Sequence, residues 1–153
     1  MPTKELTIAV NGYRSEEILR LCLQSLFREM AGTGIDYEVL VTDSATLEPT
    51  EMLMREEFPS VRFFPFQENV GFKTLVNVSI EQAKGEYIFL INSDILVSPG
   101  AIPMMLSYLK AHPEIGLLGP KQFNFNGSLQ PSCFHFFRPH TILYRRTWLG
   151  KLK

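Results

Sequence analysis

One amide, Asn11, and two carboxylates, Asp43 and Asp94, lie within three residues after the ends of short apolar segments of the chain. Each therefore stands where a predicted strand ends, and in an open parallel sheet ligands bind outside the carboxyl ends of the strands. One carboxylate could accept a hydrogen bond from a base or ribose while the other holds a divalent cation. Singly, Asp43 could cap a turn and Asp94 could start an Asx-type loop. Together with Asn11 on the same edge, they favour a shared site.

A second candidate feature is the segment 69–73, Asn-Val-Gly-Phe-Lys, which opens a predicted helix. Helix N-termini expose free N–H groups at the positive end of the dipole, and Gly71 would let a phosphate come close. Lys73 opposes that dipole in the first turn, which favours an anion nearby. The alternative is a loop glycine followed by a solvated lysine. The sequence has no GxxxxGK[ST] and no GxGxxG, so it predicts neither a P-loop nor a dinucleotide fingerprint.

Residue types and spacing disfavour other kinds of site. The three histidines lack HExxH or zinc-ligand spacing, no GxSxG is present, and Cys22 and Cys133 form no CxxC pair. Cys22 lies among leucines and is expected to be a buried small hydrophobe. Fifteen Lys plus Arg against 16 Asp plus Glu give a net charge of −1, so no overall field attracts nucleic acid. An anionic ligand must be bound by a local site.

Length and composition limit the fold class. A chain of 153 residues, 45% hydrophobic and 20% charged, suits one compact domain with an appended arm and excludes disorder, collagen and disulfide scaffolds. We expect one α/β domain over residues 1–120 and a hairpin with an aromatic and basic arm over residues 121–153. The longest apolar run, Tyr87–Ile91, is far shorter than the ~20 residues that a spanning helix needs. These features predict a cytoplasmic protein.

The elements that must position the polar residues alternate between strands and helices. The central-looking strand is Tyr87–Ile91, because its continuous apolar character indicates burial on both faces. Gly85 is expected to end the helix before it. The alternation predicts the α/β class, with a mostly parallel sheet and helices on both faces. Predicted strands are Leu6–Val10, Val39–Val41, Val61–Phe66, Tyr87–Ile91 and Ile115–Leu118. Predicted helices start after Ser15 with Ile18, Cys22, Leu26 and Met30 on one face, span Met52–Phe58, start at Phe72, and run from Ser98–Pro99 to about Ala111.

Beyond residue 120 the alternation ends. Asn126–Gly127 predicts a hairpin turn, and residues 134–148 are rich in aromatic and basic side chains. Three interpretations of the segment 134–148 stay open. It could form an apolar interface, including one between copies of this chain. Its arginines could approach lipid phosphates, or it could be a solvated basic turn.

Six segments, in order along the chain, resemble motifs of the family 2 glycosyltransferases of GT-A fold, most closely the rhamnosyltransferase-like branch. The resemblance covers almost the whole chain. It implies a Rossmann-like nucleotide-sugar-binding sheet, truncated relative to the full family fold, as the N-terminal donor-binding part of an inverting transferase. The six segments are Leu6–Tyr13, Tyr37–Ser44, Glu68–Phe72 with Asn77, Gly85–Asp94, His112–Gly116 and Gly127–Ser132.

The resemblance also implies roles for single residues. Asp43 would hydrogen-bond the base, and Asn92 would stand where the family often has a ribose-contacting carboxylate. Asp94 would bind Mg²⁺ or Mn²⁺ on the diphosphate of a UDP- or dTDP-linked sugar, since hard cations prefer oxygen ligands. The implied nucleotide-binding residues are Val10, Asn11, Tyr13, Asp43, Asn69, Gly71, Lys73, Asn92 and Ser93.

The chain departs from the family pattern in ways that leave alternatives open. Asn92 is neutral, which removes one charge from the cation site, and the segment 44–49 lacks the usual polar turn. Family members continue into a second half that binds the acceptor and supplies the general base, and no residue here is placed to be that base. The chain is then the donor-binding half of a glycosyltransferase, a part that a partner subunit completes, or a non-catalytic nucleotide-sugar-binding or assembly module. A lipid-linked acceptor would bring the protein to the inner face of the membrane.

A nucleotidyltransferase of related α/β shape is a further alternative. It is disfavoured because such an enzyme needs a glycine-rich and basic nucleotide loop near the N-terminus. Residues 11–14, Asn-Gly-Tyr-Arg, supply only one glycine and one arginine.

Overall fold

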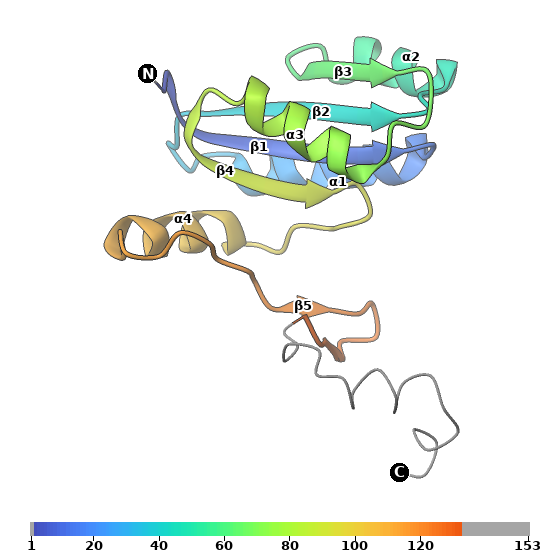
Figure 1. Cartoon of the computed structure of the whole chain (residues 1–153). Coiled ribbons are helices and arrows are strands. Elements are labelled where there is room, and N and C mark those ends of the chain that lie inside the picture. Colours follow the sequence, from blue (N-terminus) through green and yellow to red (C-terminus); the bar gives the residue numbers. More distant parts are fainter. Residues whose placement is uncertain (1, 133–153) are drawn as a thin grey trace, which may run out of the picture. The chain divides into compact units, whose positions relative to one another are not determined.

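A computed structural model describes residues 2–132, in two compact units that divide after Gly116 (Figure 1). The first unit has a four-stranded sheet in the order β3-β2-β1-β4, and each neighbouring pair is parallel. The parallel sheet and its helices confirm the predicted α/β class. The strands are β1 (Lys4–Tyr13), β2 (Tyr37–Ser44), β3 (Arg62–Phe66) and β4 (Gly85–Asn92), and the helices are α1 (Glu16–Met30), α2 (Glu48–Glu56), α3 (Phe72–Gln82) and α4 (Ala101–Ala111).

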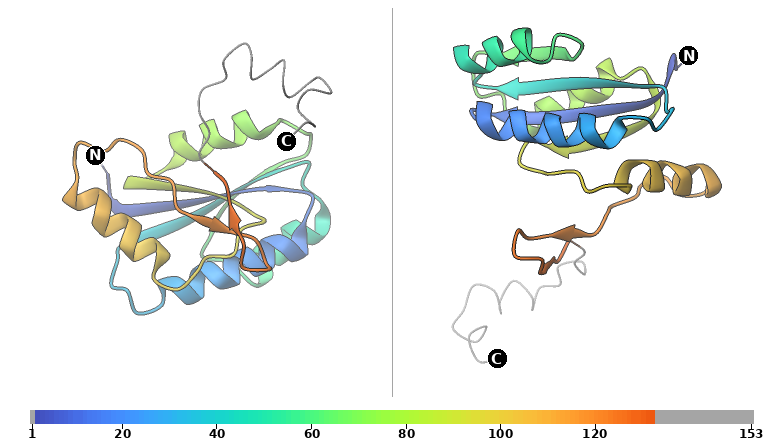
Figure 2. Two further views of the ribbon diagram at one scale, coloured as in Figure 1. Left: turned by 90° about the horizontal axis from the view of Figure 1, so that it is seen from below. Right: turned by 180° about the vertical axis from the view of Figure 1, so that it is seen from behind.

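Helices cover both faces of the sheet, as the opposite views in Figures 1 and 2 show. On one face α3 packs over β1 and β2. On the other face, alternate residues of β1 and β2 form the main core with α1, α2 and α4. Because strand side chains alternate between faces, every second residue of β1 enters this core. The core includes Leu6, Ile8 and Val10 of β1, Leu19, Cys22, Leu23 and Leu26 of α1, Leu53 and Met54 of α2, and Ile102 and Leu106 of α4.

Helix α1 forms because its apolar residues recur at helical spacing and its charges match the helix dipole. Glu16 and Glu17 lie in the first turn and Arg28 lies in the last. The buried stripe is not quite the one expected from the sequence, since Ile18 is 45% exposed and Leu19 is buried in its place. The burial of Cys22 is confirmed.

The carboxyl ends of β1, β2 and β4 meet at one edge of the sheet. Asn11 pairs with Thr42 on one side and with Asn92 on the other, and Gly12 pairs with Asp43. The predicted convergence of the strand ends is therefore confirmed.

The prediction of a central position for Tyr87–Ile91 is wrong. These residues lie in β4, at an edge of the described sheet, and the inner strands are β1 and β2. Leu90 is 45% exposed because α3 packs over β1 and β2, away from β4. Residues 115–118, predicted as a strand, are not one in the structure.

Gly85 does not end α3 as predicted, since it is the first residue of β4 and α3 ends at Gln82. A Cβ at Gly85 would lie 2.3 Å from the backbone nitrogen of Thr7. Glycine is therefore needed here for the close approach of β4 to β1.

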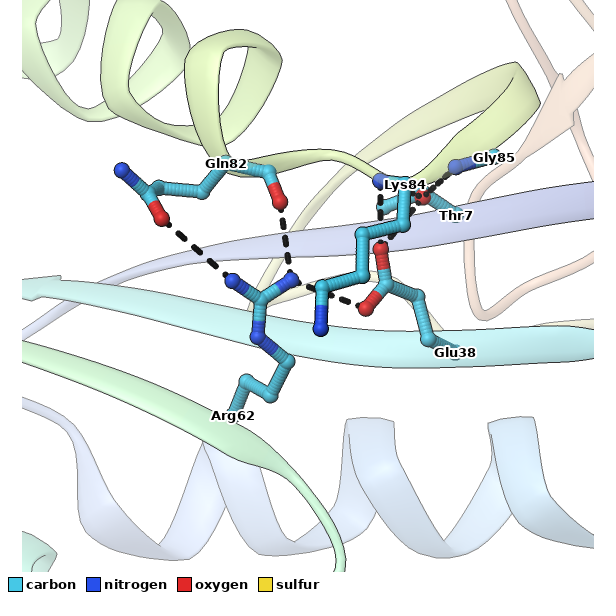
Figure 3. Close-up of polar contacts among 6 residues, drawn as sticks. All are labelled: Thr7, Glu38, Arg62, Gln82, Lys84 and Gly85. Atoms are coloured by element: carbon cyan, nitrogen blue, oxygen red, sulfur yellow. Dashed lines mark hydrogen bonds and ion pairs between the residues drawn. The ribbon is translucent and has the colours of Figure 1, made fainter. Parts of the chain in front are cut away.

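A polar cluster joins the amino-terminal ends of the strands to the end of α3 (Figure 3). Glu38 accepts hydrogen bonds from Thr7 Oγ1 at 2.8 Å, Arg62 Nη1 at 2.9 Å and the backbone N–H of Lys84 at 2.7 Å. Arg62 Nη1 also donates to the carbonyl oxygen of Gln82 at 2.8 Å. This amino-edge cluster thus fixes the C-terminal end of α3 on the sheet.

In the second unit, β5 (Gln122–Phe123) and β6 (Leu129–Gln130) form an antiparallel hairpin. Asn126 and Gly127 lie in its turn, as predicted. The segment 134–148 lies outside the described residues. Within residues 2–132, no helix has the length and apolar character needed to cross a membrane.

Candidate functional site

An open hollow of about 450 Å³ lies at the sheet edge where β1, β2 and β4 end. Its floor comes from the strand ends, and its sides come from the first turns of α1 and α3 and from the loop after β4. Residues far apart in the sequence are thus gathered into one site. The lining residues are Asn11, Gly12, Tyr13, Ser15, Ile18, Ser44, Asn69, Gly71, Phe72, Leu75, Asn92, Ser93 and Asp94.

Most of the residues that the sequence singled out line this hollow, and three do not. Val10 is fully buried in the core on the α1 face. Asp43 is buried beside Gly12, and Lys73 is exposed on α3 outside the lining. Those in the lining are Asn11, Tyr13, Asn69, Gly71, Asn92, Ser93 and Asp94.

A buried polar network fixes the side chain of Asn11 at the floor of the hollow. Asn11 Oδ1 accepts hydrogen bonds from Thr42 Oγ1 at 2.8 Å and from Ser79 Oγ of α3 at 3.1 Å. Thr42 and Ser79 are fully buried, and Asn11 is 5% exposed. Asn11 Nδ2 is buried without a partner among the described residues. Because an unmade buried hydrogen bond costs about 1–3 kcal/mol, this donor is suited to an acceptor on a ligand.

Sequence reasoning missed Thr42 and Ser79 as site residues. A threonine in a strand and a serine in a helix are too common to signal a site. Their partnership appears only once α3 packs on the sheet.

Asp43 is a buried carboxylate at the same edge. It is 1% exposed, and its Oδ2 has no hydrogen-bond partner in the described part of the chain. Burial disfavours the charged form and raises the pKa of Asp43 above its usual value. An N–H or O–H group that reached this carboxylate would relieve the cost of burying it.

The start of α3 is tied to the end of β2. The backbone N–H of Val70 donates to Ser44 Oγ at 3.0 Å, and Asn69 Oδ1 accepts from the N–H of Gly71 at 3.1 Å. Gly71 has a φ of 76°, in the left-handed region that favours glycine. Among the described residues, no side chain caps the first turn of α3. The N–H of Thr74 donates to the carbonyl of Gly71 at 3.2 Å, so the N–H groups left for a ligand at the rim of the hollow are those of Phe72 and Lys73.

The loop after β4 carries the carboxylate of the hollow. The N–H of Ser93 donates to the carbonyl of Asn11 at 3.0 Å, and the N–H of Val97 donates to Ser25 Oγ of α1 at 3.1 Å. The loop is thus held to both β1 and α1, and the side chain of Asp94 remains exposed. Beneath it, burial and then the nearby Asp94 carboxylate raise the pKa of Cys22 to about 12, which makes this thiol unreactive.

The donor set around Asp94 fits a hard cation that shares its ligands with a phosphate. Asp94, Asn92 and Ser93 bring carboxylate, amide and hydroxyl oxygens to one wall of the hollow. Residues 2–132 contain no group of three or more His, Cys, Asp or Glu side chains placed to hold a metal. A cation here would need oxygen ligands from a bound ligand and from water, which Mg²⁺ accepts readily.

Comparison with curated proteins identifies a relative of similar sequence. The chain is 30% identical over 106 residues to the N-acetylglucosaminyl-diphospho-decaprenol L-rhamnosyltransferase of Mycobacterium tuberculosis. The match covers 62% of this chain and 34% of the relative. The chain thus spans about a third of the length of that protein.

Solved glycosyltransferases share the fold. The chain matches Staphylococcus aureus TarS 1-349 in complex with UDP-GlcNAc with a TM-score of 0.61 at 21% identity, over 71% of this chain and 32% of TarS 1-349. It matches mannosyltransferase PcManGT from Pyrobaculum calidifontis, in complex with GDP-Man and Mn²⁺, with a TM-score of 0.60 at 21% identity, over 71% of this chain and 34% of PcManGT. These GT-A neighbours confirm the predicted fold.

The family assignment rests on the sequence as a whole. The family described as Glycosyl transferase family 2 matches residues 7–152, which include every residue that lines the hollow. The chain belongs to glycosyl transferase family 2.

Proposed function

We propose that this chain binds the nucleotide-diphosphate sugar of an inverting glycosyl transfer. The observation that carries the proposal is the hollow itself, in which the ends of β1, β2 and β4 bring Asn11, Ser44 and Asp94 to one place. TarS and PcManGT, which share the fold, are described with UDP-GlcNAc and with GDP-Man. Their ligands support a donor of the same chemical class, for which we propose a UDP- or dTDP-linked sugar.

The residues of the hollow suit the parts of such a donor. Tyr13 is 49% exposed and offers an aromatic face for the base. Asn11 and the buried Asp43 would fix the base or ribose by hydrogen bonds, one as donor and one as acceptor. The uncapped first turn of α3, which begins after Gly71, would bind phosphate oxygens through its N–H groups, and Lys73 would add positive charge there.

Asp94 would hold Mg²⁺ or Mn²⁺, with Asn92 and Ser93 beside it. A bound cation would stabilise the negative charge that develops on the departing diphosphate. The loop bonds from Ser93 to Asn11 and from Val97 to Ser25 keep Asp94 in position for this task.

The described lining of the hollow offers only one carboxylate, Asp94, and we assign it to the cation. The general base for the acceptor hydroxyl would therefore come from outside this lining. We propose that residues 1–120 bind the donor and that residues 121–153, with the aromatic segment 134–148, contact the part that binds the acceptor or a second copy of the chain. The name of the mycobacterial relative supports a lipid-linked acceptor, which would place the protein at the inner face of the membrane.

Thermal unfolding of the 153-residue chain with and without ligand tests the proposal. We expect UDP- or dTDP-sugar with Mn²⁺ to stabilise the fold by about 2.7 kcal/mol at 100 times its Kd, because it binds only the folded state. Asp94→Ala is expected to remove the metal-dependent part of the shift. Glu86→Ala, at an exposed carboxylate outside the hollow, is the matched control. An unchanged Tm at millimolar donor would contradict the proposal.

An assay of sugar transfer and donor hydrolysis, run beside the binding measurement, separates an enzyme from a non-catalytic binding module. Donor binding with neither transfer nor hydrolysis, in the longest form of the protein that can be expressed, would favour the module.

A further inference from the structure

Gly12 and Asp43 are direct neighbours on β1 and β2. A Cβ at Gly12 would lie 2.5 Å from Asp43 Oδ1 and 3.4 Å from Asp43 Cγ. Real Cβ atoms do not come within 2.5 Å of another atom, so Asp43 Oδ1 occupies the space that a side chain at position 12 would need. Gly12 has no positive φ, and the reason for glycine is therefore space rather than backbone conformation.

The position of this pair relative to the hollow is informative. Gly12 belongs to the lining, whereas Asp43 lies just behind it with Oδ2 unpartnered in the described part of the chain. A buried carboxylate oxygen without a hydrogen bond is costly to the protein. The Asp43 carboxylate is therefore suited to accept a hydrogen bond from a donor group of a bound ligand. Glycine at position 12 leaves the carboxylate more accessible from the hollow than any other residue would.

We propose that Gly12 is a positioning residue for Asp43, and that its missing side chain holds the carboxylate where it accepts a hydrogen bond from an N–H or O–H group of the nucleotide. This inference rests on the proposed function. It adds the requirement that residue 12 has no side chain, because the Asp43 carboxylate occupies the space that a Cβ would take.

A comparison with Gly85 shows why the effect of Gly12 differs from a purely structural one. At Gly85 a Cβ would meet backbone atoms, 2.3 Å from Thr7 N and 2.6 Å from Leu6 C, which the sheet holds in place. At Gly12 the clashing atom is the end of a side chain, which can turn away. We therefore expect Gly12→Ala to fold and to displace the Asp43 carboxylate.

Isothermal titration of UDP onto the 153-residue chain tests the inference. We expect Gly12→Ala and Asp43→Ala each to weaken UDP binding roughly tenfold or more, the range for a hydrogen bond to a charged group. The double variant is expected to bind no more weakly than Asp43→Ala alone, because both changes remove the same contact. Inorganic pyrophosphate, which lacks the base and ribose, is expected to bind Gly12→Ala and wild type alike, whereas a general disturbance of the site would weaken both ligands.

Gly116→Ala is the matched control, since a Cβ there meets no atom within 4 Å and Gly116 has no positive φ. It is expected to bind UDP as wild type does. If Gly12→Ala fails to fold, the double variant, which lacks the carboxylate, is expected to regain the fold. A double variant that also fails to fold would overturn the inference.

A second measurement does not depend on nucleotide. The side-chain carboxyl ¹³C resonance of Asp43, assigned with Asp43→Asn, is expected to shift in Gly12→Ala while that of the exposed Asp36 stays unchanged. An unmoved Asp43 resonance, wild-type UDP affinity in Gly12→Ala, or additive losses in the double variant would each overturn the inference. If wild type binds neither UDP nor any other nucleoside diphosphate, the proposed function fails, and the Asp43 resonance still decides whether Gly12 positions the carboxylate.

Discussion

Removal of the Glu38 carboxylate tests the amino-edge cluster described for the fold. Glu38 is 10% exposed and accepts three hydrogen bonds, from Thr7, Arg62 and Lys84. In Glu38→Ala, Arg62 keeps its bond to the carbonyl of Gln82 and Lys84 N–H keeps a 3.2 Å bond to Thr7. Since these partners offset part of the loss, we expect the free energy of unfolding to fall by about 1.5–3 kcal/mol, the range for one hydrogen bond to a charged group.

The sign of the pH dependence follows from the surroundings of Glu38. Burial by itself raises its pKa, but hydrogen bonds from Arg62, Thr7 and Lys84 N–H, with the Arg62 charge, outweigh burial and hold the pKa below its usual value of 4.5. The charged carboxylate therefore stabilises the fold above pH 4.5, and this contribution is lost as the pH falls through the folded-state pKa. Glu38→Gln, which keeps the shape but not the charge, is expected to approach wild type in stability as the solution is acidified.

Urea unfolding followed by circular dichroism, at neutral and acid pH, measures both effects. Glu86→Ala and Glu86→Gln are the controls, because Glu86 is an exposed carboxylate on β4. We expect these surface changes to stay within about 0.5 kcal/mol of wild type. A Glu38→Ala loss no larger than the Glu86→Ala loss would refute the reasoning, and so would a Glu38→Gln deficit that grows on acidification.

Three further predictions concern buried groups of the site. In the variant Cys133→Ser, we expect Cys22 to resist a thiol reagent near pH 8 in the native protein and to react once the protein is unfolded in urea. The reason is that burial and the Asp94 carboxylate raise the pKa of Cys22 to about 12. Rapid labelling of the native protein would contradict this prediction. Asp43→Asn is expected to raise the free energy of unfolding near neutral pH, because burial raises the pKa of Asp43 and so disfavours its charged form. In denaturation curves this gain in stability should shrink as the pH falls toward 3.8, the pKa of the carboxyl in the unfolded chain. A gain that persists in acid would count against this prediction. Ser79→Ala is expected to cost about 1 kcal/mol in urea unfolding by removing a buried donor to Asn11, whereas the exposed Ser107→Ala is not; equal effects of the two would argue against the network.

The convergence of the strand ends could be predicted from the sequence because it follows from a general rule. Parallel strands end at the same edge, so polar residues after apolar runs must gather there. Asn11, Asn92 and Asp94 do so. The rule does not say which face of the sheet each residue takes, and this depends on the alternation of side chains along the strand. Val41 and Asp43 point to the α1 face, which is why Asp43 is buried beside Gly12.

The errors have equally specific causes. The apolar run of β4 indicates a need for burial but not which element supplies it, and the structure leaves Leu90 45% exposed. Gly85 was expected to end a helix because glycine often does, whereas its role is to let two backbones approach. Such contacts between distant residues are not encoded in local sequence.

The attachment of α3 affects how variants of this protein are to be interpreted. The amino-edge cluster fastens one end of the helix through Gln82, while the other end borders the hollow at Phe72 and Leu75. A helix of 11 residues spans about 16 Å, so the two ends are well separated yet move as one rod. Weaker ligand binding in a variant of Arg62 or Glu38 would therefore indicate that α3 has tilted, and not that the substituted residue contacts the ligand. In a mutational scan, residues of the amino-edge cluster would therefore be mistaken for residues that contact the ligand, unless the orientation of α3 were measured as well.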